Sequence, residues 1–164
     1  MALRVTRMFD ADVPGDPALF APHNKFTVVE HRQDGLRCLQ SLADASLCFS
    51  PEQQRREFVD GHYLRAYLRH KKVLNACFLD ALALCLRETE SKKRAETMDL
   101  LVPPKFWKDA NGWHLYTFFW GTLYADPSGR LFVRYLCKVG GVSFGLLGLD
   151  NPYFRVNTPA AVWE

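Results

Sequence analysis

Apolar positions between Gly35 and Phe49 recur every three or four residues, which is the period of a helix with one buried face. This pattern predicts a peripheral helix over residues 35–49. A second helix is expected to begin after Ser50, because a serine followed by Pro51, with Gln53 three positions after it, is typical of a helix start. Several Lys and Arg side chains follow it, and they are interpreted as a solvated helix face rather than an anion-binding patch.

Residues 73–86 have a different pattern, because they are apolar nearly all round with Asp80 as their only charge. Such a segment predicts a helix that is buried on most of its sides. The charged run over residues 87–94 is expected at the surface, and Pro103-Pro104 should close the helical part of the chain.

Before and after these helices, the sequence predicts irregular chain and strands. Residues 10–24 are rich in Asp, Pro and Gly and predict an irregular arm, with a short strand over residues 25–31. After residue 104, aromatic runs alternate with turn signals, which predicts an antiparallel meander. The turn signals are Asn111-Gly112, Asp126 to Gly129 and Gly140-Gly141.

Together these patterns predict a single α+β domain, in which a helical N-terminal half with a buried central helix packs on a C-terminal antiparallel sheet. Its expected parts are an arm over residues 1–34, a helical half over 35–102 and a sheet half over 103–164. A chain of 164 residues with 48% hydrophobic side chains is suited to one folded unit.

Composition narrows the class of protein. A net charge of +3 lacks the strong excess of a dedicated nucleic-acid binder. No apolar run is long enough for a membrane span and no signal-peptide core is evident, so we expect a cytoplasmic protein. Five cysteines without a Cys-x-x-Cys pair argue against a disulfide framework and a zinc knuckle, and no cofactor is expected. His31, His62 and His70 lack ligand-like spacing and are expected at the surface.

Cys77 is the main candidate for chemistry. If Asn75 caps the buried helix, Cys77 lies in its first turn, where free N–H groups and the helix dipole stabilise a thiolate. Such a cysteine can act as a nucleophile near neutral pH, while the alternative is a thiol that only fills core space.

The segment from Asn75 to Leu86 resembles the cysteine box of papain-like peptidases, notably ubiquitin-specific proteases and the leader proteases of RNA viruses. The resemblance implies a papain-like fold, a nucleophilic Cys77, and positions for Asn75 and Asp80 at the oxyanion site or supporting the catalytic residues. It also implies hydrolysis of a peptide or isopeptide bond in a protein substrate, such as the enzyme's own polyprotein or a ubiquitin-like modifier, in the host cytoplasm if the protein is viral. By the same analogy, the C-terminal Val162-Trp163-Glu164 is a candidate product end near the site.

A nucleophilic cysteine needs a base, and His114 is the only histidine after Cys77. A turn near Trp120-Gly121 would place His114 opposite Asp126 on neighbouring strands. A strand His followed by Asp-Pro also resembles transglutaminase-like proteins, arylamine acetyltransferases and bacteriocin-processing peptidases, which implies His114 as general base and acid and Asp126 as its orienter. The alternative is that Asp126 only forms a hairpin turn with Gly129.

Two hypotheses follow from the sequence. The first is a cysteine peptidase, although Lys71 and Lys72 stand where papain-like enzymes usually have an oxyanion donor, so that Asn75 or the Cys77 N–H would have to serve. The second is a non-catalytic interaction module that binds a protein or nucleic acid through the basic helix face and exposed aromatics. Its candidate aromatics are Trp107, Trp113 and Trp120.

Overall fold

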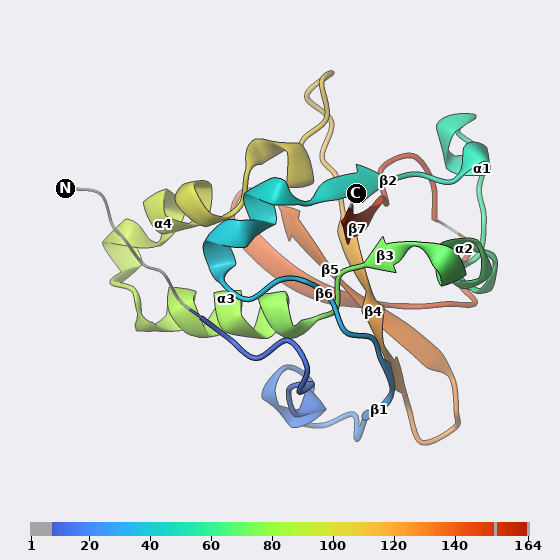
Figure 1. Ribbon diagram of the computed structural model, residues 1–164, viewed down its shortest axis with the longest axis horizontal. Coiled ribbons are helices and arrows are strands. Elements are labelled where there is room, and N and C mark those ends of the chain that lie inside the picture. The colour runs from blue at the N-terminus through green and yellow to red at the C-terminus, as the bar shows by residue number, and fades with distance from the viewer. Residues whose placement is uncertain (1–7, 153, 164) are drawn as a thin grey trace.

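A computed structural model describes residues 8–152 and 154–163, and a mostly antiparallel seven-stranded sheet lies at its centre (Figure 1). The strand order is β2-β7-β4-β5-β6, while β1 pairs with β4 and β3 pairs with β7. The strands are β1 (Thr27–His31), β2 (Ser46–Cys48), β3 (Lys72–Val73), β4 (Thr117–Ala125), β5 (Leu131–Lys138), β6 (Val142–Gly148) and β7 (Ala160–Trp163).

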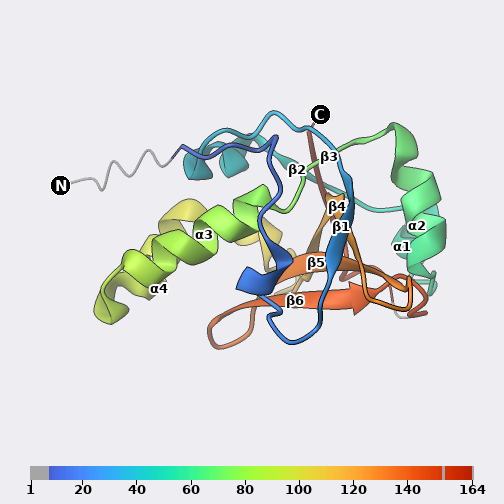
Figure 2. The same cartoon turned by 90° about the horizontal axis from the view of Figure 1, so that it is seen from below.

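The helices lie at two ends of this sheet. Figure 2 shows α3 and α4 side by side at one end and α1 and α2 at the other. The α-helices are α1 (Pro51–Gln54), α2 (Gly61–Tyr67), α3 (Cys77–Glu88) and α4 (Arg94–Leu101). The 3₁₀ turns are η1 (Pro17–Leu19), η2 (Leu39–Asp44), η3 (Leu68–His70), η4 (Ser91–Lys93) and η5 (Pro104–Phe106).

The expected elements are found in part. The Ser50 cap is confirmed, because its hydroxyl accepts from the Gln53 N–H while the Gln53 side chain accepts from the Ser50 N–H. However, α1 ends at Gln54, and α2 begins after six intervening residues with a cap of its own, Asp60. The helix predicted over residues 35–49 is wrong: it is replaced by η2 and β2, since the backbone of residues 46–48 pairs with β7.

The mixed class and the mostly antiparallel sheet are confirmed, but the papain-like arrangement is not. The first half of the chain supplies three strands, β1, β2 and β3, so the helices and the sheet do not occupy separate halves of the sequence. The turns at residues 126–129 and 140–141 are confirmed as the connections of the β4–β5 and β5–β6 hairpins. The turn expected near Trp120-Gly121 is absent, because both residues lie inside β4.

Strand β4 is buried along its whole length and divides the core into two clusters. Neighbouring side chains of a strand point to opposite faces, so Phe119 packs towards α3 while Phe118 and Trp120 pack towards α2. The ring of Phe78, the second residue of α3, stacks on Phe119 with 5.7 Å between centroids. This packing fixes the first turn of α3, and with it Cys77, against the middle of the sheet.

Candidate active site

Cys77 is the first residue of α3, in the first turn as the sequence predicts. Its backbone N–H donates to Asn75 Oδ1 over 2.9 Å, so Asn75 satisfies one of the free donors of the helix start. The residue is buried, with 6% of its surface exposed. The helix therefore holds the thiol at its N-terminal end and inside the molecule.

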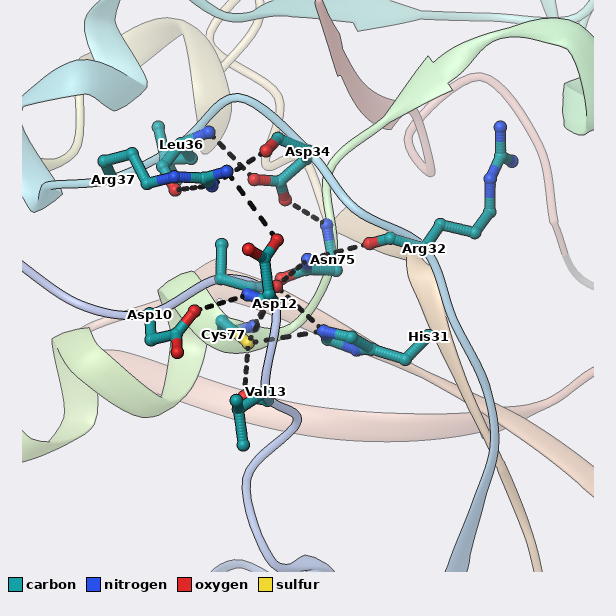
Figure 3. A network of polar contacts seen from close by, with 11 residues as sticks. Asp10, Asp12, Val13, His31, Arg32, Asp34, Leu36, Arg37, Asn75 and Cys77 are labelled. Carbon is teal, nitrogen blue, oxygen red and sulfur yellow. Dashed lines mark hydrogen bonds and ion pairs between the residues drawn. The ribbon is translucent and has the colours of Figure 1, made fainter.

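The histidine beside this thiol is His31, which was not among the expected site residues. Its Nε2 lies 3.7 Å from Cys77 Sγ (Figure 3). Its Nδ1 lies 2.9 Å from Thr122 Oγ1. His31 is the last residue of β1 and pairs directly with Thr122 of β4. The register of these two strands thus places the imidazole next to the start of α3, and His31 is half-buried rather than on the surface.

The hydrogen bonds define the tautomer of His31. Its Nε2 lies 2.9 Å from the carbonyl oxygen of Ala11, which can only accept, so Nε2 carries the hydrogen of the neutral ring. Nδ1 is then an acceptor, and the Thr122 hydroxyl donates to it while accepting from the Ala76 N–H. In this state Nε2 cannot take a proton from Cys77.

Residues 8–20, which we call the strap, pass next to the Cys77 thiol (Figure 3). The carbonyl oxygen of Ala11 accepts from Asn75 Nδ2 over 2.7 Å as well as from His31. The Cys77 Sγ–H donates to the Val13 carbonyl over 3.2 Å and lies 3.7 Å from that of Ala11. Cys77, His31 and Asn75 therefore all contact main-chain carbonyls of the strap.

The strap is held on both sides of the site. On one side, the Phe9 N–H donates to the Arg37 carbonyl, and Asp12 forms an ion pair with the Arg37 guanidinium at 3.6 Å. On the other side, the Phe20 ring packs edge-on against Tyr124 and lies 3.9 Å from the Arg134 guanidinium. These contacts keep the strap closed over Cys77.

Beside Cys77, a cavity of about 380 Å³ separates the strap from α3. Apolar side chains of both elements form most of its wall, and the Asp80–Arg134 pair closes one end. Its lining includes Phe9, Val13, Leu19, Phe20, Ala81 and Leu84. The cavity gives a small group access to the thiol without unfolding of the helix.

The closed site disfavours a thiolate. Burial raises the pKa of the Cys77 thiol to about 12, and the negative charges of Asp80, Asp34, Asp10 and Asp12 add to this shift. Two of these carboxylates, Asp10 and Asp12, belong to the strap, which also contributes to the burial. The expected activation of the thiol by the helix start is thus outweighed while the strap is in place.

Asn75 is fixed from several directions. Its backbone N–H donates to Asp34 Oδ2 over 2.7 Å, and its Nδ2 also donates to the Arg32 carbonyl over 2.9 Å. A Cβ on Gly121 would lie 2.7 Å from the Asn75 Cα, so only glycine allows β4 to approach this closely. Since the Cys77 N–H is committed to Asn75 Oδ1, the Nδ2 group is the donor that faces a carbonyl oxygen next to the thiol.

The structure does not bring together the expected base and its orienter. His114 precedes β4 and Asp126 follows it, so nine strand residues hold them roughly 25 Å apart. His114 is exposed and pairs with Lys108 through the backbone. Asp126 accepts from Ser128 and from the Arg130 N–H, which is the turn role given as its alternative. The cause of the difference is the missing turn at Gly121.

Asp80, which the resemblance places beside the nucleophile, forms an ion pair with a buried arginine. Its carboxylate accepts from the Arg134 Nη1 over 2.6 Å, and the Arg134 side chain is 2% exposed. Arg134 comes from β5, so this ion pair ties α3 to the sheet rather than orienting a histidine. The C-terminal strand β7 also belongs to the sheet. Val162 pairs with Val73 there and is not the free product end that the analogy suggested. Glu164 lies outside the described residues.

The features that suggested an interaction module do not form one surface. Of the three candidate tryptophans, Trp120 is buried and Trp107 is half-buried, while Trp113 is 71% exposed. Along α2 a cavity of about 600 Å³ is lined by three arginines. Two of them are engaged, because Arg65 pairs with Glu30 and Arg32 donates to main-chain carbonyls.

Three further results concern cofactors, membranes and relatives. Over residues 8–152 and 154–163, no three His, Cys, Asp or Glu side chains are grouped as a metal site would need, and the five cysteines are free thiols. No helix in the described part of the chain has the length and apolarity to cross a bilayer. The chain matches no protein-family profile, no curated protein and no solved structure.

Proposed function

We propose that this protein is a cysteine peptidase in which Cys77 is the nucleophile and His31 the general base. The observation that carries the proposal is the 3.7 Å approach of His31 Nε2 to a thiol at the start of a helix. Thr122 takes the place expected for Asp126, because its hydroxyl contacts the other ring nitrogen. His31 precedes Cys77 in the sequence, which is the reverse of the order expected from papain-like peptidases, so the proposal concerns the chemistry and not that fold.

The chemistry starts from an open site, in which Nε2 of His31 is no longer bonded to the strap. The Thr122 hydroxyl can accept as well as donate, so it suits the tautomer with hydrogen on Nδ1. Nε2 then takes the Cys77 proton as the sulfur attacks the carbonyl carbon of a peptide bond. Asn75 Nδ2 donates to the oxyanion that forms.

The remaining steps return the enzyme to its starting state. The C–N bond breaks, and the proton on His31 Nε2 passes to the departing amine, leaving the acyl group on Cys77 as a thioester. A water molecule then gives one proton to His31 and attacks the thioester carbon. The carboxylic acid leaves, and the proton on His31 returns to the Cys77 sulfur.

Hydrolysis of a mixture of quenched fluorescent peptides tests the proposal. Both the wild-type chain and Ala11→Leu are measured, because a leucine does not fit at the buried Ala11 position and should open the strap. The substitutions Cys77→Ser and His31→Gln are then made separately in the protein that is active, wild type or Ala11→Leu. Each should lower its rate of hydrolysis at least 100-fold. His114→Gln is the matched control, since that histidine is exposed, and it should retain at least half of the rate.

Two outcomes would overturn the assignment. If His114→Gln lowered the rate of hydrolysis at least 100-fold and His31→Gln did not lower it, the base would be His114. The proposed peptidase function would be wrong if neither the wild-type nor the Ala11→Leu protein hydrolysed any peptide. It would also be wrong if hydrolysis persisted in Cys77→Ser.

A further inference from the structure

We infer that the strap occupies this site as a pseudosubstrate, and that the site takes an extended peptide with a small side chain on the acyl side of the bond to be cleaved. The inference rests on the proposed function, because it names the substrate class of the same site. It assigns Ala11 to the position of the acyl residue and Asp12 to the first residue of the leaving group.

The hydrogen bonds of the Ala11 carbonyl carry this assignment. A peptidase must hold the carbonyl oxygen of its substrate next to the nucleophile and against the donors that later stabilise the oxyanion. The Ala11 oxygen meets this description, because it accepts from Asn75 Nδ2 over 2.7 Å and lies 3.7 Å from Cys77 Sγ. The third contact, from His31 Nε2 at 2.9 Å, holds the base in its inactive tautomer.

The burial of the strap explains the expected preference for a small side chain. Ala11 is 0% exposed, whereas its neighbours Asp10 and Asp12 are exposed. The main chain is therefore bound at a point where the molecule surrounds a single methyl group. A longer side chain at this point would meet packed atoms instead of the nearby cavity, whose lining does not include Ala11.

Covalent attachment makes the strap a strong competitor. A segment of the same chain reaches the site at a high effective concentration, so a free peptide gains access only when the strap has moved away. The test therefore uses the full-length Ala11→Leu protein, with full-length Ala11→Gly as its matched control. Glycine keeps the carbonyl and fits the space, so the control should remain closed.

The measurement is the rate at which iodoacetamide alkylates Cys77, followed by peptide mapping. Ala11→Leu should label at least ten-fold faster than wild type, and Ala11→Gly within three-fold of it. Two capped synthetic peptides are then added to Ala11→Leu. One has the sequence of residues 8–15, Met-Phe-Asp-Ala-Asp-Val-Pro-Gly, and the other has Leu in place of Ala. We expect the alanine peptide to slow labelling at least ten-fold at saturation and the leucine peptide less than two-fold.

The outcomes separate this inference from the proposed function. Protection that is equal for the two peptides, or absent for both, overturns the pseudosubstrate even if Ala11→Leu hydrolyses other peptides through Cys77. Protection by the alanine peptide alone supports it, even if no peptide is hydrolysed, in which case the site binds such peptides and the peptidase is wrong. If hydrolysis occurs, mass spectrometry should find the cleaved bonds after Ala, Gly or Ser, and cleavage after large residues would contradict the inference.

Discussion

Cys77 Sγ and His31 Nε2 lie 3.7 Å apart although 46 residues separate them in the sequence. Two independent features produce this approach: the register that sets His31 opposite Thr122, and the packing that holds the start of α3 against β4. Because both features belong to the sheet and helix framework outside the strap, the pair is fixed before any ligand binds. In the closed structure the Ala11 carbonyl of the strap binds Nε2, so that this nitrogen cannot accept the Cys77 proton.

The first prediction concerns the protonation of Cys77. A pKa of about 12, against an ordinary value of 9.0, leaves the closed protein almost without thiolate at neutral pH. The rate of Cys77 alkylation in the wild-type protein should therefore be very low at neutral pH and keep rising with pH up to about 12, whereas that of an ordinary thiol levels off near pH 9. In Ala11→Leu the profile should shift to lower pH, because the burial and the charges of Asp10 and Asp12 are removed. An unchanged profile would show that the strap does not control the thiol.

The same pKa predicts how stability depends on pH. Above pH 9 the thiol of the unfolded chain loses its proton while the folded thiol keeps it up to about pH 12. The unfolded state then binds fewer protons, so the free energy of unfolding should fall as the pH rises through this window. Urea titrations of wild type and Cys77→Ala at several pH values test this, and the extra alkaline loss should be smaller in the variant. Equal losses in the two proteins would contradict the prediction.

A further prediction concerns the close contact between β4 and the site. In Gly121→Ala the new Cβ would lie 2.7 Å from both N and Cα of Asn75, which are backbone atoms that cannot rotate away. We expect a loss of about 1–3 kcal/mol in the free energy of unfolding, the usual range for overpacking. Displacement of Asn75 should also lower any Cys77-dependent hydrolysis. Gly141→Ala is the control, since nothing lies within 4 Å of its Cβ position.

The local patterns of the sequence identified Cys77 but not the histidine that lies beside it. The first-turn position of Cys77 depends on neighbours in the chain, so it could be predicted, although the N-cap is Ala76 and Asn75, one residue before it, only accepts from the Cys77 N–H. His31 could not be singled out, because its approach to Cys77 depends on the pairing of β1 with β4, which no local pattern contains. A prediction that β1 pairs with β4 would have been needed to identify His31 as a neighbour of Cys77.

The error at His114 and Asp126 has a physical origin in one glycine. Gly121 was interpreted as part of a turn, although it lies inside β4 where the strand passes Asn75. Glycine serves a turn through its backbone freedom and a crowded strand through its missing Cβ, and the sequence alone does not separate the two uses. Moving the turn from Gly121 to residues 126–129 carries Asp126 to the opposite end of β4 from His114.

Asp126 provides a prediction for the hairpin turn. Hydrogen bonds from Ser128, followed by those from the Arg130 and Ser128 backbone, hold the pKa of its carboxyl below the ordinary value of 3.8. The turn therefore gains stability from the ionised carboxylate above pH 3.8, and this contribution is lost as the pH falls through the lowered pKa. Asp126→Ala should lower the melting temperature at pH 7 and leave the rate of Cys77 alkylation unchanged. A change in that rate would instead connect Asp126 with the site.

The last prediction concerns Arg134, whose buried guanidinium joins α3 to the strap. It donates to Asp80 over 2.6 Å and lies 3.9 Å from the Phe20 ring. In Arg134→Met the Asp80 carboxylate loses its partner at a poorly solvated position, so we expect a loss of about 3 kcal/mol in the free energy of unfolding. Because Phe20 loses a contact as well, Cys77 should be alkylated faster. Arg130→Met removes an ion pair whose side chains are half exposed, and it should change neither quantity appreciably. Equal destabilisation in both variants would show that burial of the Arg134 pair has no special role.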